Sequence, residues 1–418
     1  MKPLFLLSGL GLVLAVGCRK DEAPQAPPLE QLRTYDVIPV SAERIAGGYL
    51  LECKRALTDP QLAYAQLLDE AGDPSGFIDF ALLPNIAENI TFRREDLVIT
   101  DVLPWDQGSF MLLGFGIETD HEDRLHALVY HVNASGQLRY PAMRRYIGAE
   151  AELVRSNDLN ERYRTRVLGT RTNSGDLVIA ARYENDEFGT LRLMRLPIGT
   201  SNVPFSIEHR IAPSEELQFL RARSGSDQVM IGFDTPSQTT NESKVLALQS
   251  FNFTPLGADF EGFTEVALRE ARALSVHYTT DGLRVVGSYD AGSDEPRSFM
   301  SSGTLIQDIT TTTLATPAGR AAIAYAAEPS SGMMRTTYNL FEGGVLAPES
   351  ERNDRISDLV LADADVSGSL STSRTILAGQ GARALATFST ADGQVIIGAL
   401  HPYLNAEYLH AFFLVVQD

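Results

Sequence analysis

The sequence predicts an all-β protein that forms a single β-propeller of seven blades, with six or eight blades as alternatives. Three observations support this fold class. From about residue 37 onward, short apolar runs alternate with clusters of Gly, Pro, Asn, Asp and Ser, which is typical of strands and turns. No long stretch has the 3.6-residue apolar period of an amphipathic helix. A glycine-marked strand also recurs along the chain, as in repeat architectures.

The repeated unit is a turn residue, usually Gly, followed by a short apolar strand that often ends in a second Gly. Its seven copies begin at Gly48, Gly108, Gly175, Asp227, Gly282, Gly319 and Gly393. The mean spacing is about 58 residues, but it is irregular around Gly319, which we interpret as marking a different strand of its blade. One blade cannot bury both faces of its sheet, so neighbouring blades must cover them, and ring closure removes exposed edges.

Individual strands follow from the same pattern. The segment 63–72 has helix propensity, but it aligns with 127–136, which is rich in β-branched and aromatic residues. We therefore expect strands in both, because tertiary context overrides a weak local preference. The segment 408–416 predicts a strong final strand, and 35–40 could pair into the same blade and close the ring. Tandem β-sandwiches are the alternative fold, which the recurring glycine marker disfavours.

The repeat resembles the degenerate propeller repeats of Bacteroidetes-type secreted proteins, in which a Gly-Gly-Tyr strand is followed by a hairpin that ends in Asp-x-x-Gly. Gly47-Gly48-Tyr49 and Asp69-Glu-Ala-Gly72 carry this resemblance, followed by Asn133-Ala-Ser-Gly136. No Trp-Asp dipeptide and no kelch-type Gly-Gly pair recurs along the chain.

The N-terminal segment predicts export. Residues 1–17 combine Lys2, the apolar run 4–16 and small residues before Cys18, which is the pattern of a signal peptide. The apolar run is too short to cross the ~30 Å hydrocarbon core. The small residues before Cys18 resemble the bacterial lipobox, which implies cleavage there and acylation of Cys18. The expected domains are the signal peptide, a lipidated Pro-rich tether at 18–35 and the propeller at 36–418.

The residues after Cys18 predict a location. Lys20-Asp21-Glu22 resembles the export signal of Bacteroidetes surface lipoproteins. This resemblance implies a bacterial outer-membrane lipoprotein that faces the medium, with the periplasmic face as the alternative.

Composition excludes several classes of function. The formal net charge is −19, whereas a nucleic-acid-binding protein usually has an excess of basic residues. No nucleic acid is therefore expected as a partner. Once Cys18 is lipidated, Cys53 is the only other cysteine, so no intramolecular disulfide can form. Cys53 follows Leu50 and Leu51 in an apolar run, where a free thiol usually behaves as a small buried hydrophobe.

Metal sites are the first candidates for chemistry. His121, His126 and His131 are five residues apart, and strand geometry would place His126 opposite the other two, so a shared zinc ion is disfavoured. Asp363 and Asp365 before Gly368 resemble the start of a calcium loop, but Arg374 stands where the distal Glu is needed. An ordinary Asp-rich turn is the favoured interpretation, so no cofactor or metal is assigned.

Catalytic signals are weak. A glycosidase would need a pair of catalytic carboxylates, but the acidic loop residues have no distinguishing spacing. Charged side chains in solvated loops are the simpler explanation for Asp120, Glu122, Asp123, Asp290, Asp294 and Glu295. No Gly-x-Ser-x-Gly elbow, P-loop or dinucleotide fingerprint is present. Trp105 and Tyr403 are loop aromatics that could anchor an interface or pack between blades.

The expected function is therefore binding. We expect a lipid-anchored protein of the cell envelope that presents propeller loops to a glycan, a peptide or a partner in an outer-membrane complex. No catalytic residue is assigned. The alternative is a propeller glycoside hydrolase or polysaccharide lyase that uses loop carboxylates.

Overall fold

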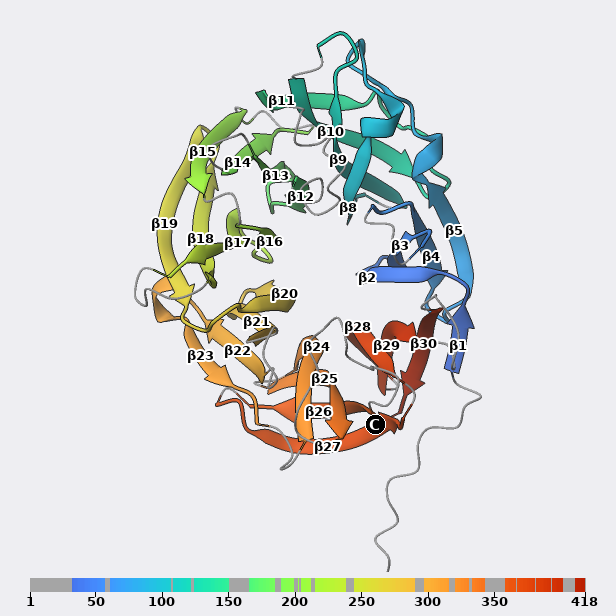
Figure 1. The fold of residues 1–418 in the computed structure, drawn as a ribbon, viewed down its shortest axis with the longest axis vertical. Coiled ribbons are helices and arrows are strands. Elements are labelled where there is room, and N and C mark those ends of the chain that lie inside the picture. Colours follow the sequence, from blue (N-terminus) through green and yellow to red (C-terminus); the bar gives the residue numbers. More distant parts are fainter. Residues whose placement is uncertain are drawn as a thin grey trace, which may run out of the picture.

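The structure is a seven-bladed β-propeller, as predicted. This computed structural model describes residues 32–56, 61–106, 108–121, 124–149, 165–184, 189–198, 202, 204–211, 215–237, 244–289, 297–315, 320–330, 333–342, 358–365, 367–379, 381–391, 393–400 and 410–417. Within these ranges, seven four-stranded antiparallel sheets follow one another around a ring (Figure 1). The alternative of tandem β-sandwiches is wrong.

Each of blades 1 to 3 is a meander in which the first strand lies nearest the ring axis. Blade 1 contains β2 (Ile38–Ile45), β3 (Gly48–Lys54), β4 (Tyr64–Asp69) and β5 (Pro74–Asp79). Blade 2 contains β8 (Val98–Pro104), β9 (Ser109–Ile117), β10 (Arg124–Asn133) and β11 (Met143–Ala149). Blade 3 contains β12 (Arg166–Arg171), β13 (Leu177–Glu184), β14 (Gly189–Leu196) and β15 (Phe205–Ile211). Segment 63–72 therefore contains a strand, β4, despite its helix propensity.

Blades 4 to 6 repeat this order. Blade 4 contains β16 (Leu217–Ala222), β17 (Gln228–Pro236), β18 (Lys244–Thr254) and β19 (Gly257–Val266). Blade 5 contains β20 (Arg272–Thr279), β21 (Gly282–Tyr289), β22 (Arg297–Gly303) and β23 (Thr310–Thr313). Blade 6 contains β24 (Arg320–Ser330), β25 (Met333–Glu342), β26 (Asp358–Ala364) and β27 (Leu370–Leu377). Six of the seven markers, five glycines and Asp227, precede or begin the second strand of a blade, whereas position 319 precedes the first strand, β24, as its irregular spacing suggested.

Blade 7 joins the two ends of the described chain. It contains β28 (Ala382–Thr390), β29 (Gly393–Leu400), β30 (His410–Val416) and, at its outer edge, β1 (Leu32–Tyr35). Leu32 pairs with Leu414 and Tyr35 pairs with Ala411. The closing strand thus occupies the last four residues of the segment expected to be a tether, and the propeller begins at Leu32 rather than at residue 36.

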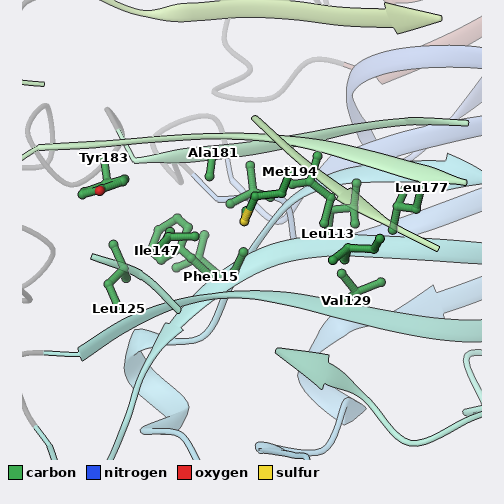
Figure 2. Close-up of a cluster of buried hydrophobic side chains, with 14 of the residues drawn as sticks. Leu113, Phe115, Leu125, Val129, Ile147, Leu177, Ala181, Tyr183 and Met194 are labelled. Atoms are coloured by element: carbon green, nitrogen blue, oxygen red, sulfur yellow. The ribbon is translucent and has the colours of Figure 1, made fainter. Parts of the chain in front are cut away.

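A hydrophobic core lies between every pair of adjacent blades, which explains why the second strands are apolar on both faces. In β9, Leu113 and Phe115 pack towards blade 3, where they meet Leu177 and Met194 (Figure 2). The alternate residue Leu112 packs towards blade 1. The remaining clusters join blades 3 and 4, 4 and 5, 5 and 6, 6 and 7, and 7 and 1. Each blade therefore depends on both neighbours for its buried surface.

Steric crowding explains why the repeat has a second glycine. The innermost strands of blades 2, 5 and 7 contain a bulge, opposite Gly114, Gly287 and Gly398 respectively. A Cβ at Gly114 would overlap the carbonyl oxygen of Val98, and a Cβ at Gly287 would overlap that of Arg272. In these three blades the bulged strand comes too close to its partner to leave room for a Cβ, whereas the equivalent bulges of blades 1 and 6 face Cys53 and Tyr338.

The two faces of the ring differ in their connections. Strands one and two, and strands three and four, are joined on one side, which we call the turn face; its connections include 46–47, 280–281 and 365–369. The opposite side, the loop face, carries longer connections, of which 80–97 is described throughout. The connection 80–97 contains η2 (Phe80–Leu82), the short pair β6 (Ile86–Ala87) and β7 (Ile90–Thr91), and η3 (Arg94–Asp96).

Candidate functional site

The loop face carries two adjoining cavities between blades 1 and 2. The inner cavity is about 330 Å³ and lies at the start of the innermost strands; its lining includes Ser41, Glu52, Thr100 and Arg166. The outer cavity is about 240 Å³, and its lining includes Arg94. Both cavities are lined by Gln61, Leu62 and Ile99. Together they form one radial groove, which we call the blade 1–2 groove.

Local strand structure explains which side chains reach the groove. In β3, Leu51 and Cys53 are buried whereas Glu52 and Lys54 are only partly buried, so the charged residues alternate with the core residues. This alternation is the period-two pattern of a strand. Arg94 comes instead from the connection before β8, and tertiary structure alone brings it to the groove.

Glu52 lies at the inner end of the groove, where both of its carboxylate oxygens accept hydrogen bonds. The hydroxyl of Ser41 donates to Oε2, and the backbone N–H of Val102 donates to Oε1 at 2.7 Å. Burial and the neighbouring Asp101 carboxylate raise the pKa of Glu52 to about 8, against the opposing effect of these hydrogen bonds. Glu52 therefore keeps its proton to a higher pH than an ordinary glutamate does.

Asp101 is a second carboxylate near the ring axis, and it forms a hydrogen bond between two blades. Its Oδ2 accepts the backbone N–H of Gly169 in blade 3 at 2.8 Å. The adjacent Thr100 makes a similar connection, because its hydroxyl bonds both the N–H and the carbonyl of Val167. Burial raises the pKa of Asp101, although the Gly169 N–H and nearby arginines oppose this effect. Sequence analysis did not single out Glu52 or Asp101.

The histidines do not come together. His126 and His131 both lie on β10 and are buried, but His126 contacts Glu118 at 3.3 Å and His131 contacts Ser109 at 3.0 Å. Burial lowers the pKa of both imidazoles. His121 lies in the turn before β10. In the part of the chain that the structure describes, no group of three or more His, Cys, Asp or Glu side chains is placed to hold a metal ion.

The aspartates of the possible calcium loop have protein partners. Asp363 pairs with Arg335 at 2.8 Å. Asp365 Oδ1 accepts the backbone N–H groups of Ser367 and Ser369 at 2.8 and 3.1 Å, in the turn between β26 and β27. The interpretation as an ordinary Asp-rich turn fits these contacts.

The same turn occurs in three blades. Asp69 and Asn133 accept the N–H groups two and four residues later, as Asp365 does. The glycine three residues after each has a positive φ, of 84°, 77° and 78° respectively. Asp365 thus belongs to the Asp-x-x-Gly repeat, which is the signal that could have identified it from sequence.

A third cavity, of about 400 Å³, lies on blade 6 and is a weaker candidate. It is lined by Arg335, Asp363 and Arg374, together with residues of β26 and β27. Its charged groups are engaged within the protein, because Arg335 pairs with Asp363 and Arg374 donates to the carbonyl of Gln417 at 2.8 Å. The blade 1–2 groove is therefore the better candidate.

Other predicted residues have structural roles or lie outside the described ranges. Cys53 is fully buried, as expected, and burial raises the pKa of its thiol to about 12. Trp105 lies on the turn face, packs against the core between blades 2 and 3, and stacks with Arg171 at 4.5 Å. Asp120 is exposed on the loop face. The residues that lie outside the described ranges are Cys18, Lys20, Asp21, Glu22, Glu122, Asp123, Asp290, Asp294, Glu295 and Tyr403.

No helix among the described residues is long and apolar enough to span a membrane.

Comparison with known proteins gives similarity of fold at low identity. No protein-family model and no curated protein matches the sequence. A member of the DUF4221 family from Bacteroides vulgatus is 10% identical, with a TM-score of 0.44, over 93% of this chain and 95% of that chain. An α-L-arabinofuranosidase from Fusarium graminearum is 10% identical, with a TM-score of 0.40, over 78% and 94%. The polysaccharide lyase Uly1 is 10% identical, with a TM-score of 0.38, over 90% and 89%. The chain is thus similar to these proteins without being assigned to any of their families.

Proposed function

We propose that this protein is a lipid-anchored binding protein of the bacterial outer membrane that takes a glycan into the blade 1–2 groove. The observation that carries the proposal is the groove itself. It combines hydrogen-bonding side chains such as Ser41, Gln61 and Thr165 with apolar side chains such as Val40 and Leu62. Sugar rings present hydroxyl groups at their edges and C–H groups on their faces, so a mixed lining of this kind suits them.

The direction of β1 supports the proposal. Leu32 pairs with Leu414 near the end of β30, whereas Tyr35 pairs with Ala411 near its start. β1 therefore starts at the turn face and ends at the loop face. A lipid on Cys18 would hold the turn face towards the membrane and leave the loop face, with its groove, directed away from it.

Two measurements test the anchor and its location. Radiolabelled palmitate should label the wild-type protein but not Cys18→Ser, and Cys18→Ser should leave the membrane fraction. Protease added to intact cells should cleave the wild-type protein while a periplasmic marker stays intact. Protection from protease, together with cross-linking to an outer-membrane partner, would contradict exposure on the cell surface.

A glycan array tests the binding function. We expect the detergent-solubilised protein to bind a subset of oligosaccharides, and Gln61→Ala with Thr165→Ala to weaken that binding at least tenfold. The matched control is Thr310→Ala, an exposed hydroxyl on the outer strand of blade 5. Unchanged binding by the groove variants would show that the groove is not the site.

Hydrolysis or elimination of a glycan is the second candidate function. It is favoured by one observation, the raised pKa of Glu52 beside a second carboxylate, because a general acid must carry its proton near neutral pH. Against it, both oxygens of Glu52 accept hydrogen bonds from the protein. Product release from a bound oligosaccharide that disappears in Glu52→Gln would favour the enzyme over the binding protein.

A further inference from the structure

The blade 1–2 groove differs in charge from the rest of the chain. The formal net charge of the protein is −19. The groove is nevertheless lined by four cationic side chains, Lys54, Arg55, Arg94 and Arg166, and by one carboxylate, that of Glu52. A positively charged groove on an acidic protein concentrates anionic ligands locally while the remaining surface repels them.

Two of these cations are held in place by backbone carbonyl oxygens. Arg166 Nη1 donates to the carbonyl oxygen of Leu217 at 3.1 Å, and Arg94 Nη1 donates to the carbonyl oxygen of Leu83. A carbonyl oxygen orients a guanidinium but does not neutralise it, and a guanidinium has five N–H donors. Both arginines therefore keep further N–H donors for a ligand.

The other charged residues in the lining are Arg55 and Glu52. Arg55 pairs with Asp79 at 3.0 Å, but its side chain is more than half exposed, so solvent screens that pair. Burial and Asp101 raise the pKa of Glu52 to about 8, which reduces the negative charge that this carboxylate contributes. The lining of the groove thus carries four cationic side chains against one carboxylate, with the Asp101 carboxylate close to Arg166.

We propose that the groove selects an acidic oligosaccharide, one that carries carboxylate or sulfate groups, with Arg94 and Arg166 as the anion-binding residues. This proposal rests on the proposed glycan-binding function and specifies its ligand. Arginine suits the task because its planar fork can donate two parallel hydrogen bonds to a carboxylate or sulfate. The cations line both cavities, so acidic groups on neighbouring sugar units could be bound together.

The size of the groove limits the length of the ligand. The two cavities, about 330 and 240 Å³, fall within or near the roughly 300–1,000 Å³ of small-ligand sites. A short segment or chain end of an acidic polysaccharide fits this space. The hydroxyl and amide side chains in the lining favour a sugar over an acidic peptide of similar charge.

Isothermal titration calorimetry with three probes tests the inference. The probes are a trigalacturonate, the same trisaccharide with its carboxyl groups reduced to alcohols, and a tri-aspartate peptide. We expect the trigalacturonate to bind at least tenfold more tightly than the reduced trisaccharide and the peptide. Its affinity should also fall as salt rises from 50 to 300 mM, because screening weakens exposed charge pairs.

Matched arginine variants locate the effect. Arg94→Gln and Arg166→Gln should each weaken trigalacturonate binding about tenfold and leave binding of the reduced trisaccharide within twofold. Arg284→Gln is the control, because Arg284 Nη1 also donates to a backbone carbonyl, that of Met333 at 3.1 Å, but lies outside the groove. Its affinity should stay within twofold of the wild type.

The other outcomes separate this inference from the function on which it rests. Equal binding of the acidic and reduced trisaccharides would overturn charge selection and leave glycan binding intact. Binding of the peptide alone would overturn both. If the protein binds only neutral sugars in a wider glycan panel, the proposal of an acidic ligand is likewise overturned. If the protein binds no glycan at all, the proposed function itself is rejected.

Discussion

Glu52 in blade 1 accepts a hydrogen bond from the backbone N–H of Val102 in blade 2, at 2.7 Å. The same kind of connection recurs around the ring axis, where Asp101 accepts the N–H of Gly169 at 2.8 Å and Gln218 accepts that of Ala273 at 2.7 Å. Side chains from one blade thus satisfy the innermost strand of the next. At the inner end of the groove, the same carboxylate both joins two blades and forms part of the candidate site.

The first prediction concerns the pH dependence of stability. The pKa of Glu52 is about 8 in the folded protein and about 4.3 in an unfolded chain, so the folded state binds more protons between these values. The free energy of unfolding should therefore fall as pH rises from about 4 to 8. Urea unfolding at pH 5, 7 and 9 should show a smaller fall for Glu52→Gln than for the wild type. Glu70→Gln, at an exposed turn, is the control for charge removal; identical pH slopes for the wild type and Glu52→Gln would contradict the prediction.

The second prediction concerns the glycine opposite an inner-strand bulge. Gly287→Ala should destabilise the propeller by about 1–3 kcal/mol or more, because the new Cβ would overlap the carbonyl oxygen of Arg272. Gly257→Ala is the matched control, since its Cβ would meet only the ring of Phe205 at 3.8 Å. Chemical denaturation of both variants checks this, and equal losses of stability would show that the bulge does not require glycine.

The third prediction concerns the turn at Asp365. Asp365→Ala removes the acceptor for two backbone N–H groups and should lower the free energy of unfolding. Asn133→Ala should cost a similar amount, because Asn133 makes the same two bonds in blade 2. Adding millimolar calcium should shift the Tm of the wild type and of Asp365→Ala equally. A calcium-dependent rise that only the wild type shows would instead support a calcium loop.

The fourth prediction concerns ring closure. A chain that begins at residue 36 lacks β1 and leaves β30 as an exposed edge strand. It should have a lower Tm and form larger species on size-exclusion chromatography, because unpaired edges associate with one another. A chain that begins at residue 32 should match the mature protein in both measurements. If the two shortened chains behave alike, β1 contributes little to closure.

Much of the fold could be predicted because its signals are local. The glycine of each marker and the apolar strand after it repeat at blade length, and Cys53 lies in such a strand with buried neighbours. The final strand was also evident, as β30 shows. Two details were less accessible. The closing strand lies in a Pro-rich region that resembles a tether, and Asp365 shares its pattern with the start of a calcium loop although it caps a repeated turn.

The sequence by itself determined the architecture, because periodic apolar strands that cannot bury both faces alone must stack into a closed ring. Only the tertiary structure decided the candidate site. Glu52, Arg94 and Arg166 come from three separate segments, and the packing of neighbouring blades brings them to one groove. The raised pKa of Glu52 likewise depends on burial and on Asp101 in the next blade. Charge and proton affinity in the groove are therefore set by packing between blades, which no local pattern of residues encodes.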